Sequence, residues 1–364
     1  MRNLLVIAGP LSGYLFALYR AVARDWPCAV HLIHEPLPES VGFAHEQVSF
    51  DDFRSLDWTK ATGRELARFV RCCRPDVVVI HGTRPARAMG VALVILPRTT
   101  PVLFASDANI CELVSHRGKL LSRMAAYAAL FSRVHTTLSL GLSNELALRL
   151  LGARSIRRLP IYAIDFDAFD QARDGTPAVI PGELKRLAIV ARLVEAKNLA
   201  GAIEAVSSDA ELRNGVMLSF VGDGPLRADL EVLARRRQVK AEFLGAVPRS
   251  QVGATLARAD ALLLPSTQEP WGIVVCEALG MGIPVVASPA VGAAISLAGD
   301  TNAVIVASSP SVPDFANSMR TFLSRAGELT VAARRSASRV RREYSLPDVT
   351  QRLVALLQQV TAGA

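Results

Sequence analysis

Two glutamates stand close together in the second half of the chain, at Glu269 and Glu277, with seven residues between them. Glu269 falls in a loop after an expected strand, whereas Glu277 falls on a helix expected to begin at residues 272–274. The rest of that helix is apolar, and burying a carboxylate there without partners is costly. Ribose hydroxyls would be suitable partners for Glu277, and an exposed helix face is the alternative.

Two basic residues, Arg192 and Lys197, follow another expected strand. Arg192 comes directly after the apolar run LAIVA, and Lys197 stands five residues later, at the expected start of a helix. Both therefore carry positive charge at the carboxyl end of a strand, which is where ligands bind to open parallel sheets. A solvated helix start explains either residue equally well when it is taken alone.

The segment FVGDGPLRADL predicts a tight turn from a strand into a helix at Gly222 and Gly224. Glycine lets the backbone approach a ligand closely, and the N–H groups at a helix start favour an anion. The turn lacks the GxGxxG pattern, so it does not support a dinucleotide site or a dehydrogenase. The segment FLGAVPRSQV predicts a further strand and turn. The backbone of Gly245 and Val247 there could lie beside the base of a bound nucleotide.

Short apolar runs alternate with helical patterns along the whole chain. Strands are expected at 4–8, 29–34, 76–81, 101–106, 134–139, 156–160, 186–191, 217–221, 242–244, 261–264, 284–287 and 303–306. Uninterrupted apolar strands such as 77–80 indicate burial on both faces, which is typical of a parallel sheet between helices.

The alternation of strands and helices breaks at 162–184, where Asp, Pro and Gly accumulate. We therefore expect two doubly wound domains, at 1–163 and 185–345, joined by a linker at 164–184. A helix over 346–364 is expected to pack back on the first domain. Ligands are expected at the carboxyl ends of the strands, in a cleft that the two domains face.

The segments ARLVEAK, GDGP, FLGAV and EPWGIVVCEALGMGIPVVAS resemble, in order and spacing, motifs of glycosyltransferase family 4, the glycosyl transferases group 1. Enzymes of this family are retaining and have the GT-B fold of two Rossmann-like domains. The resemblance covers residues 187–306 well and the first half in architecture only. Trp271 replaces the usual Phe of the family.

The resemblance implies a nucleotide-sugar donor site in the second domain. Arg192 and Lys197 would bind the diphosphate, Glu269 would contact the transferred sugar, and Glu277 would bind the ribose hydroxyls. The remaining donor contacts implied are at Gly13, Gly222, Gly224, Gly245, Val247, Gly272, Ile273 and Val274. Because fixed cations and a helix dipole stabilise the departing charge, neither a metal nor a bound cofactor is expected.

The first domain departs from the family pattern at the end of its fourth expected strand. Many members have a histidine there, whereas this chain has Ser106 and Asp107. Asp107 could substitute for the histidine. His81 also ends a strand on the expected cleft, and a structural cap of the strand end is the alternative to catalysis there.

The bulk composition excludes several classes of protein. With 364 residues, 51% hydrophobic and 20% charged, the chain can bury two cores and is not a disordered polymer. Its five cysteines include no CxxC pair, which indicates free thiols in a reducing cytosol. No apolar run reaches the length of a membrane-spanning helix.

The net charge of +8 comes almost entirely from arginine. It favours phosphorylated substrates or an anionic membrane surface, and a genome rich in Arg codons is the alternative. Nucleic acid is not expected, because no basic cluster is interleaved with aromatic residues. The segment 116–127 is basic on one side and apolar on the other. We expect this segment to form a helix that packs on the core and turns its basic side to solvent. The alternative is a helix that lies on the membrane surface and meets a lipid-linked acceptor.

The expected function is transfer of a sugar, with retention, from a nucleotide diphosphate sugar to a glycan or lipid-linked acceptor. Bacterial cell-surface polysaccharide or glycolipid assembly is the expected setting, in the cytoplasm or peripherally on the inner face of the membrane. The alternatives are a non-hydrolysing sugar-nucleotide epimerase and a catalytically decayed nucleotide-sugar-binding subunit. The absence of the usual histidine at Ser106 keeps the second alternative open.

Overall fold

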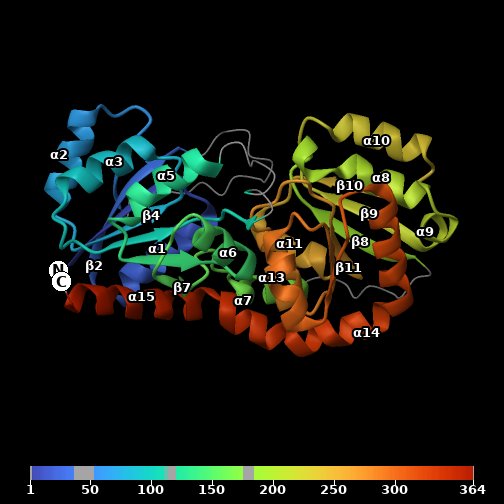
Figure 1. Cartoon of the computed structure of the whole chain (residues 1–364). Coiled ribbons are helices and arrows are strands. Elements are labelled where there is room, and N and C mark those ends of the chain that lie inside the picture. Colours follow the sequence, from blue (N-terminus) through green and yellow to red (C-terminus); the bar gives the residue numbers. More distant parts are fainter. Residues whose placement is uncertain (1, 37–52, 111–112, 114–119, 175–183, 364) are drawn as a thin grey trace. The chain divides into compact units, whose positions relative to one another are not determined.

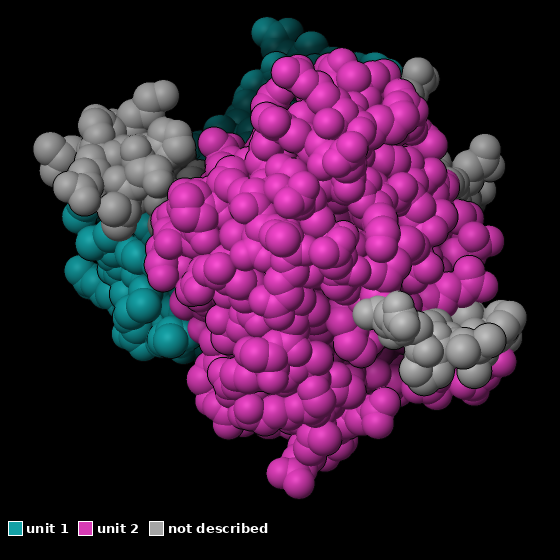
Figure 2. Space-filling model, turned by 90° about the vertical axis from the view of Figure 1, so that its right-hand side faces the viewer, with its two compact units in different colours: residues 1–39, 47–164, 343–364 teal, residues 40–46, 165–342 magenta. Residues whose placement is uncertain are grey.

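The computed structural model describes residues 2–36, 53–110, 113, 120–174 and 184–363. These residues form two compact units (Figures 1 and 2). Unit 1 contains the described residues of 1–39, 47–164 and 343–364, and unit 2 contains those of 165–342.

Unit 1 is built on a seven-stranded sheet with the order β3-β2-β1-β4-β5-β6-β7, in which every neighbouring pair is parallel. The strands are β1 (Arg2–Pro10), β2 (Cys28–Glu35), β3 (Arg54–Asp57), β4 (Val77–His81), β5 (Val102–Ala105), β6 (Thr136–Ser139) and β7 (Ile156–Arg158). The sequence pattern does not predict β3, because this edge strand is polar and partly exposed. The central strand β4 is wholly buried, so both faces of the sheet are covered.

Helices cover the two faces of this sheet. They are α1 (Gly13–Asp25), α2 (Gly63–Cys73), α3 (Ala86–Ile95), α5 (Leu120–Phe131), α6 (Leu142–Leu150) and α15 (Leu346–Ala362). One hydrophobic core joins α2, α3, α5 and α6 to the sheet. The C-terminal helix α15 packs on α1 and also contacts β4, and Arg157 donates a hydrogen bond to Gln359 at 3.0 Å. The last helix thus lies within unit 1.

Unit 2 has a six-stranded parallel sheet with the order β10-β9-β8-β11-β12-β13. Its strands are β8 (Lys185–Val190), β9 (Val216–Val221), β10 (Ala241–Gly245), β11 (Ala261–Leu264), β12 (Val285–Ala287) and β13 (Val304–Val306). Its helices are α7 (Phe166–Asp174), η2 (Glu195–Lys197), α8 (Leu199–Ser207), α9 (Ala210–Gly215), α10 (Arg227–Arg236), α11 (Arg249–Leu256), α12 (Ile273–Gly280), α13 (Gly292–Thr301) and α14 (Val312–Tyr344, whose last two residues belong to unit 1). One hydrophobic core of this unit lies where α8, α9, α10 and α14 pack on the sheet.

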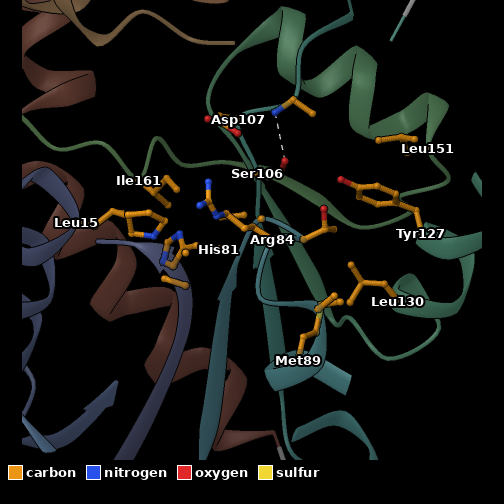
Figure 3. Close-up of a pocket in the computed structure, with 18 of the residues that line it drawn as sticks. Leu15, His81, Arg84, Met89, Ser106, Asp107, Tyr127, Leu130, Leu151 and Ile161 are labelled. Atoms are coloured by element: carbon orange, nitrogen blue, oxygen red, sulfur yellow. Dashed lines mark hydrogen bonds between the residues drawn. The ribbon is translucent and has the colours of Figure 1, made fainter. Parts of the chain in front are cut away.

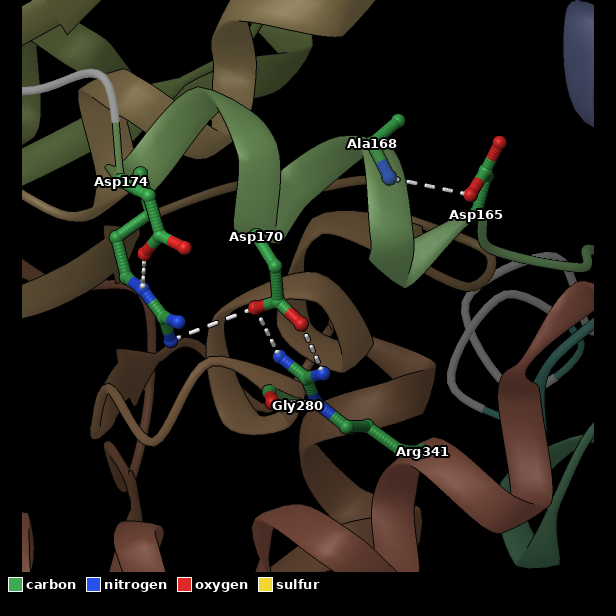
Figure 4. A network of polar contacts seen from close by, with 7 residues as sticks. Asp165, Ala168, Asp170, Asp174, Gly280 and Arg341 are labelled. Carbon is green, nitrogen blue, oxygen red and sulfur yellow. Dashed lines mark hydrogen bonds and ion pairs between the residues drawn. The ribbon is translucent and has the colours of Figure 1, made fainter.

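A polar network around Arg341 joins three helices of unit 2 (Figure 4). The guanidinium of Arg341 donates to both carboxylate oxygens of Asp170 at 2.6 and 2.7 Å, and its Nε donates to the carbonyl of Gly280 at 2.7 Å. It also lies over the Phe166 ring, 4.9 Å from the centroid. Paired hydrogen bonds between charged groups are both strong and directional, so they fix α7 against α12 and α14.

This network corrects the expected linker. Residues 166–174, which the sequence assigns to a linker, form the helix α7. Phe166 and Phe169 are buried on α7, and Asp170 is an ion-pair partner within unit 2. The rest of the expected linker, 175–183, lies outside the described residues. Helical packing of two phenylalanines outweighs the composition of Asp, Pro and Gly from which the linker was inferred.

Candidate functional site

The sequence-predicted donor residues of unit 2 follow neighbouring strands of its sheet. Arg192 and Lys197 follow β8, Gly222 follows β9, and Glu269 follows β11. The loops that carry them are hydrogen bonded to one another. The N–H of Leu193 donates to the carbonyl of Asp223 at 2.9 Å. Parallel strands end at the same edge of the sheet, so these residues share one edge of unit 2.

Gly222 and Gly224 are required by close contact between two loops. A Cβ atom at Gly222 would lie 2.0 Å from the carbonyl oxygen of Ala191, and its φ is +134°. A Cβ atom at Gly224 would lie 2.5 Å from the carbonyl oxygen of Leu193. Both glycines therefore let the loop after β9 press against the loop after β8, which carries Arg192. Gly245, with φ +75°, ends β10 beside them, and Val247 follows it half-buried.

Lys197 and Glu269 form an ion pair with each other. Their side chains are only 15% and 16% exposed. The sequence identified both residues as candidate donor-site residues, but it did not predict that they pair. Arg192, by contrast, is exposed, and the described part of the chain offers it no ion-pair partner. One cation of this site is thus held in place by a carboxylate, and the other is presented to solvent.

Asn198, which directly follows Lys197, was not predicted from the sequence. It has a left-handed backbone conformation with φ 49° and directly precedes α8. Its side-chain amide donates to the carbonyl oxygens of Pro265 and Pro310 at 3.2 and 3.1 Å. These hydrogen bonds tie the loop after β8 to the loops after β11 and β13. Asparagine tolerates this conformation better than most residues, which is the signal that could have found it.

The helix α12 begins without a side-chain cap. Its N-cap is Gly272, with φ 84°, and the first helical residues are Ile273 and Val274. The N–H groups of an uncapped helix start are suitable donors to an anion. Glu277 lies one turn further along and is 2% exposed, so the alternative of an exposed helix face is wrong.

Unit 1 contains a cavity of about 530 Å³ at the carboxyl ends of β1, β4 and β5 (Figure 3). Its polar lining includes His81, Arg84, Ser106 and Asp107. Its apolar lining includes Leu15, Met89, Leu130, Leu151 and Ile161, together with the ring of Tyr127. The three sequence-predicted residues His81, Ser106 and Asp107 therefore share one cavity. Gly13 is the first residue of α1 and does not line it, whereas Gly9 does.

The imidazole of His81 is hydrogen bonded to a tyrosine of α1. Its Nε2 lies 2.5 Å from the hydroxyl of Tyr19, and both residues are buried. Burial lowers the pKa of His81 to about 4, because a charged imidazole loses its hydration there. Burial also raises the pKa of Tyr19. Both rings are consequently neutral at pH 7.

The loop that carries Ser106 and Asp107 is held by a buried asparagine. Asn144, which is wholly buried on α6, donates to the carbonyl oxygens of Ser106 and Ala108 at 2.9 and 2.6 Å. The sequence did not predict this residue, because an asparagine in a helical pattern is usually solvated. Asp107 is hydrogen bonded to the hydroxyl of Tyr162, and burial together with that carboxylate raises the pKa of Tyr162.

Three further observations concern metals, membranes and the segment 116–127. Among the described residues, no cluster of three or more His, Cys, Asp or Glu side chains could hold a metal ion. No helix in that part of the chain is both long enough and apolar enough to cross a membrane. Residues 116–119 of that segment lie outside the residues that the structure describes. The helix α5 packs Tyr127 and Phe131 edge-on against Phe104 of the sheet.

The family comparison matches residues 171–339 to the family described as glycosyl transferases group 1. The 2-deoxystreptamine glucosyltransferase of Streptomyces kanamyceticus is 24% identical over 288 residues, which cover 73% of each chain. The glycogen synthase of Mycobacterium tuberculosis (strain H37Rv) is 35% identical over 114 residues, which cover 31% of this chain and 27% of that one.

Solved structures match over nearly the full chain. The sucrose-phosphate synthase of Thermosynechococcus elongatus has a TM-score of 0.76 at 15% identity and covers 100% of both chains. HepE of Anabaena, solved with UDP and glucose, has a TM-score of 0.72 at 15% identity over 98% of this chain and 100% of its own. At this identity the likeness shows the fold, and it confirms the expected fold class. The chain therefore has the GT-B fold, and residues 171–339 match the family described as glycosyl transferases group 1.

Proposed function

We propose that this chain is a retaining glycosyltransferase that moves a sugar from a nucleotide diphosphate sugar to an acceptor without a metal ion. The observation that carries the proposal is the cluster at one edge of the unit 2 sheet. There the paired Lys197 and Glu269, the exposed Arg192 and the uncapped start of α12 stand on neighbouring loops. The group 1 domain covers all of these residues.

The chemistry of this cluster suits departure of a diphosphate. As the glycosidic bond breaks, negative charge gathers on the leaving phosphate oxygen. Arg192, Lys197 and the N–H groups of α12 would stabilise that charge, and being held by the fold they need little reorganisation. Glu269 would orient Lys197 and contact the transferred sugar, and the buried Glu277 would accept hydrogen bonds from the ribose hydroxyls.

The named relatives support a nucleotide-sugar donor, and they do not specify which acceptor receives the sugar. One is a glucosyltransferase, and HepE was solved with UDP and glucose. Both are consistent with a nucleotide-sugar donor for this chain. The acceptor that we propose is a glycan or a lipid-linked sugar of cell-surface polysaccharide or glycolipid assembly.

The test is a panel of UDP-, GDP-, ADP- and dTDP-sugars incubated with the full-length protein, with nucleotide release measured with and without acceptors. Transfer to an acceptor with retained anomeric configuration, read by NMR, is the expected result. A changed sugar nucleotide formed without an acceptor would indicate an epimerase. Binding of a donor without release under any condition would indicate a decayed binding subunit.

Two arginine variants test whether the donor site lies at this edge of the unit 2 sheet. Arg192→Ala should abolish most nucleotide release. Arg236→Ala changes another exposed arginine, at the end of α10 away from the cluster, and should leave release unchanged. Equal activity of the two variants would contradict the proposed placement of the donor site.

A further inference from the structure

The side chain of Asn198 does not cap the helix that it precedes. Asn198 is the N-cap of α8, and an asparagine at this position usually accepts a hydrogen bond from the first helical turn. Among the described residues of α8, no N–H group donates to it. Its backbone is left-handed, and its amide reaches two loops that are distant in the sequence. The residue therefore forgoes the usual contact with its own helix in favour of distant ones.

Both distant hydrogen bonds are made by the NH2 group of the Asn198 amide. It donates to the carbonyl oxygen of Pro265, after β11, at 3.2 Å, and to that of Pro310, after β13, at 3.1 Å. A carbonyl oxygen can only accept, so both N–H groups of the amide are used. Aspartate tolerates the left-handed conformation but has no such donor, and glycine has no side chain. Asparagine meets both requirements.

The residues on both sides of Lys197 are attached to the segment that leads to Glu269. On one side, the amide of Asn198 binds the start of this segment. On the other side, the carbonyl oxygen of Ala196 accepts hydrogen bonds from the backbone N–H groups of residues 267 and 268 at 3.0 and 3.2 Å. The ammonium of Lys197 is paired with Glu269 itself. Backbone, amide and ion-pair contacts thus join the two segments around Lys197.

The place of the Asn198 amide also depends on Gly201, inside α8. A Cβ atom at Gly201 would lie 2.5 Å from Oδ1 and 2.8 Å from Nδ2 of Asn198. Both distances are shorter than a normal contact, so an alanine at this position would displace the amide. Alanine is otherwise favoured over glycine inside a helix. Glycine at position 201 therefore leaves room for the amide at a cost to the helix.

We propose that Asn198 is a positioning residue of the donor site. Its two amide hydrogen bonds hold the segment 196–198 so that the ammonium of Lys197 meets the diphosphate of the bound nucleotide. This inference rests on the proposed function for the role of Lys197. A misplacement of about 1 Å can cost about a hundredfold in rate, so a residue that touches no substrate can still act on the chemical step.

The test compares Asn198→Gly with Asn302→Gly in the full-length protein. Asn302 has a similar left-handed backbone, with φ 53°, at the end of α13, but none of the described residues hydrogen bonds to its side chain. Glycine tolerates this conformation, so each variant removes only a side chain. We expect Asn198→Gly to lower kcat for nucleotide release by about tenfold or more, with a smaller change in donor KM. Asn302→Gly should leave both unchanged. An unchanged kcat in Asn198→Gly would overturn the proposal.

A double-variant cycle separates positioning from a merely structural role. In the Lys197→Ala background Asn198→Gly has no ammonium to position, so it should lower kcat by no more than about twofold. An equal loss in both backgrounds would show that the amide only supports the fold, and it would overturn the proposal. Gly201→Ala should lower kcat by displacing the amide, and it should add nothing to Asn198→Gly, where the amide is absent. Additive losses in that combined variant would contradict the proposal.

Calorimetric titration with free UDP, GDP, ADP and dTDP distinguishes this inference from the proposed function. A free diphosphate carries the full charge of the departed leaving group, so it should bind about tenfold more weakly to Asn198→Gly and Lys197→Ala. Asn302→Gly should bind as the unsubstituted protein does. If this pattern is found while no sugar is transferred, only the proposed function fails. If sugar is transferred while Asn198→Gly behaves as the unsubstituted protein does, only this inference fails. Absence of binding of all four diphosphates would overturn both.

Discussion

At the scale of single residues, the structure distinguishes two cations that look alike in the sequence. Lys197 is mostly buried and paired with Glu269, whereas Arg192 is exposed. Both would meet charge that grows as the leaving group departs, so both should act more on kcat than on KM. Only Lys197 should also contribute to stability, because its loss leaves the Glu269 carboxylate without its cation.

Arg192→Ala and Lys197→Ala should each lower kcat by about a hundredfold or more, by analogy with loss of one oxyanion donor. The double variant should be non-additive, because both residues act on one charge. Thermal unfolding should show Lys197→Ala to be less stable than Arg192→Ala. Kinetics in which only KM rises would contradict the leaving-group role.

Glu277→Gln changes one oxygen into an amide at a buried position of α12. If the carboxylate accepts hydrogen bonds from ribose, nucleotide affinity should fall by about 1–3 kcal/mol. Calorimetric titration with the free nucleoside diphosphate measures this. Unchanged affinity in a normally folded variant would remove Glu277 from the donor site.

At the scale of elements, the ion pair between Asp170 and Arg341 makes the stability of unit 2 depend on pH. Its hydrogen bonds to Arg341 lower the pKa of Asp170. A carboxyl group with a lowered folded-state pKa adds stability above its unfolded pKa of about 3.9, and this stability is lost as pH falls through the folded-state value.

Asp170→Asn should therefore lower the free energy of unfolding by about 1–3 kcal/mol at pH 7, with a smaller difference from the unsubstituted protein below pH of about 4. Urea unfolding of the full chain at several pH values measures both. Asp174→Asn is the matched control, because its side chain is 71% exposed and its pairing is with Arg173 at the surface. A difference that is independent of pH would show that packing, not charge, holds α7.

Two glycines of unit 2, Gly222 in a loop and Gly299 in a helix, differ in the space available for a Cβ atom. Gly222→Ala would force Cβ to within 2.0 Å of a carbonyl oxygen, so it should cost more than about 1 kcal/mol. Gly299 lies within α13 with nothing within 4 Å of a Cβ atom, so Gly299→Ala should stabilise by roughly 0.5–1 kcal/mol. Thermal unfolding of both variants tests whether the turn after β9 depends on backbone contact.

At the scale of the whole molecule, the described residues of the two units contain no group of three or more His, Cys, Asp or Glu side chains that could hold a metal ion. The positive charge expected at the donor site comes from side chains and the start of a helix. We therefore expect transfer activity to persist in EDTA. Loss of activity that magnesium or manganese restores would show that a metal supplies this charge.

The sequence by itself predicted the alternation of strands and helices, with β3 and α7 as the exceptions. The apolar runs 77–80 and 261–264, the turn at Gly222 and the start of the last helix at residue 346 are local signals. The structure places strands or helix boundaries at each of them. The sequence also identified the residues that share the strand ends of unit 2, because parallel strands bring their carboxyl ends to one edge.

Only the tertiary structure decided which of these side chains contact each other. Lys197 and Glu269 are 72 residues apart, and Tyr19 and His81 are 62 apart. A helix or strand pattern specifies a face, but not the partner that packs against it. The same holds for Asn144, whose amide donates hydrogen bonds to a loop 36 to 38 residues earlier in the chain. It also holds for α7, where buried phenylalanines and an ion pair with Arg341 outweigh a loop-like composition. Burial and pairing depend on contacts between distant segments, and these form only when the chain is folded.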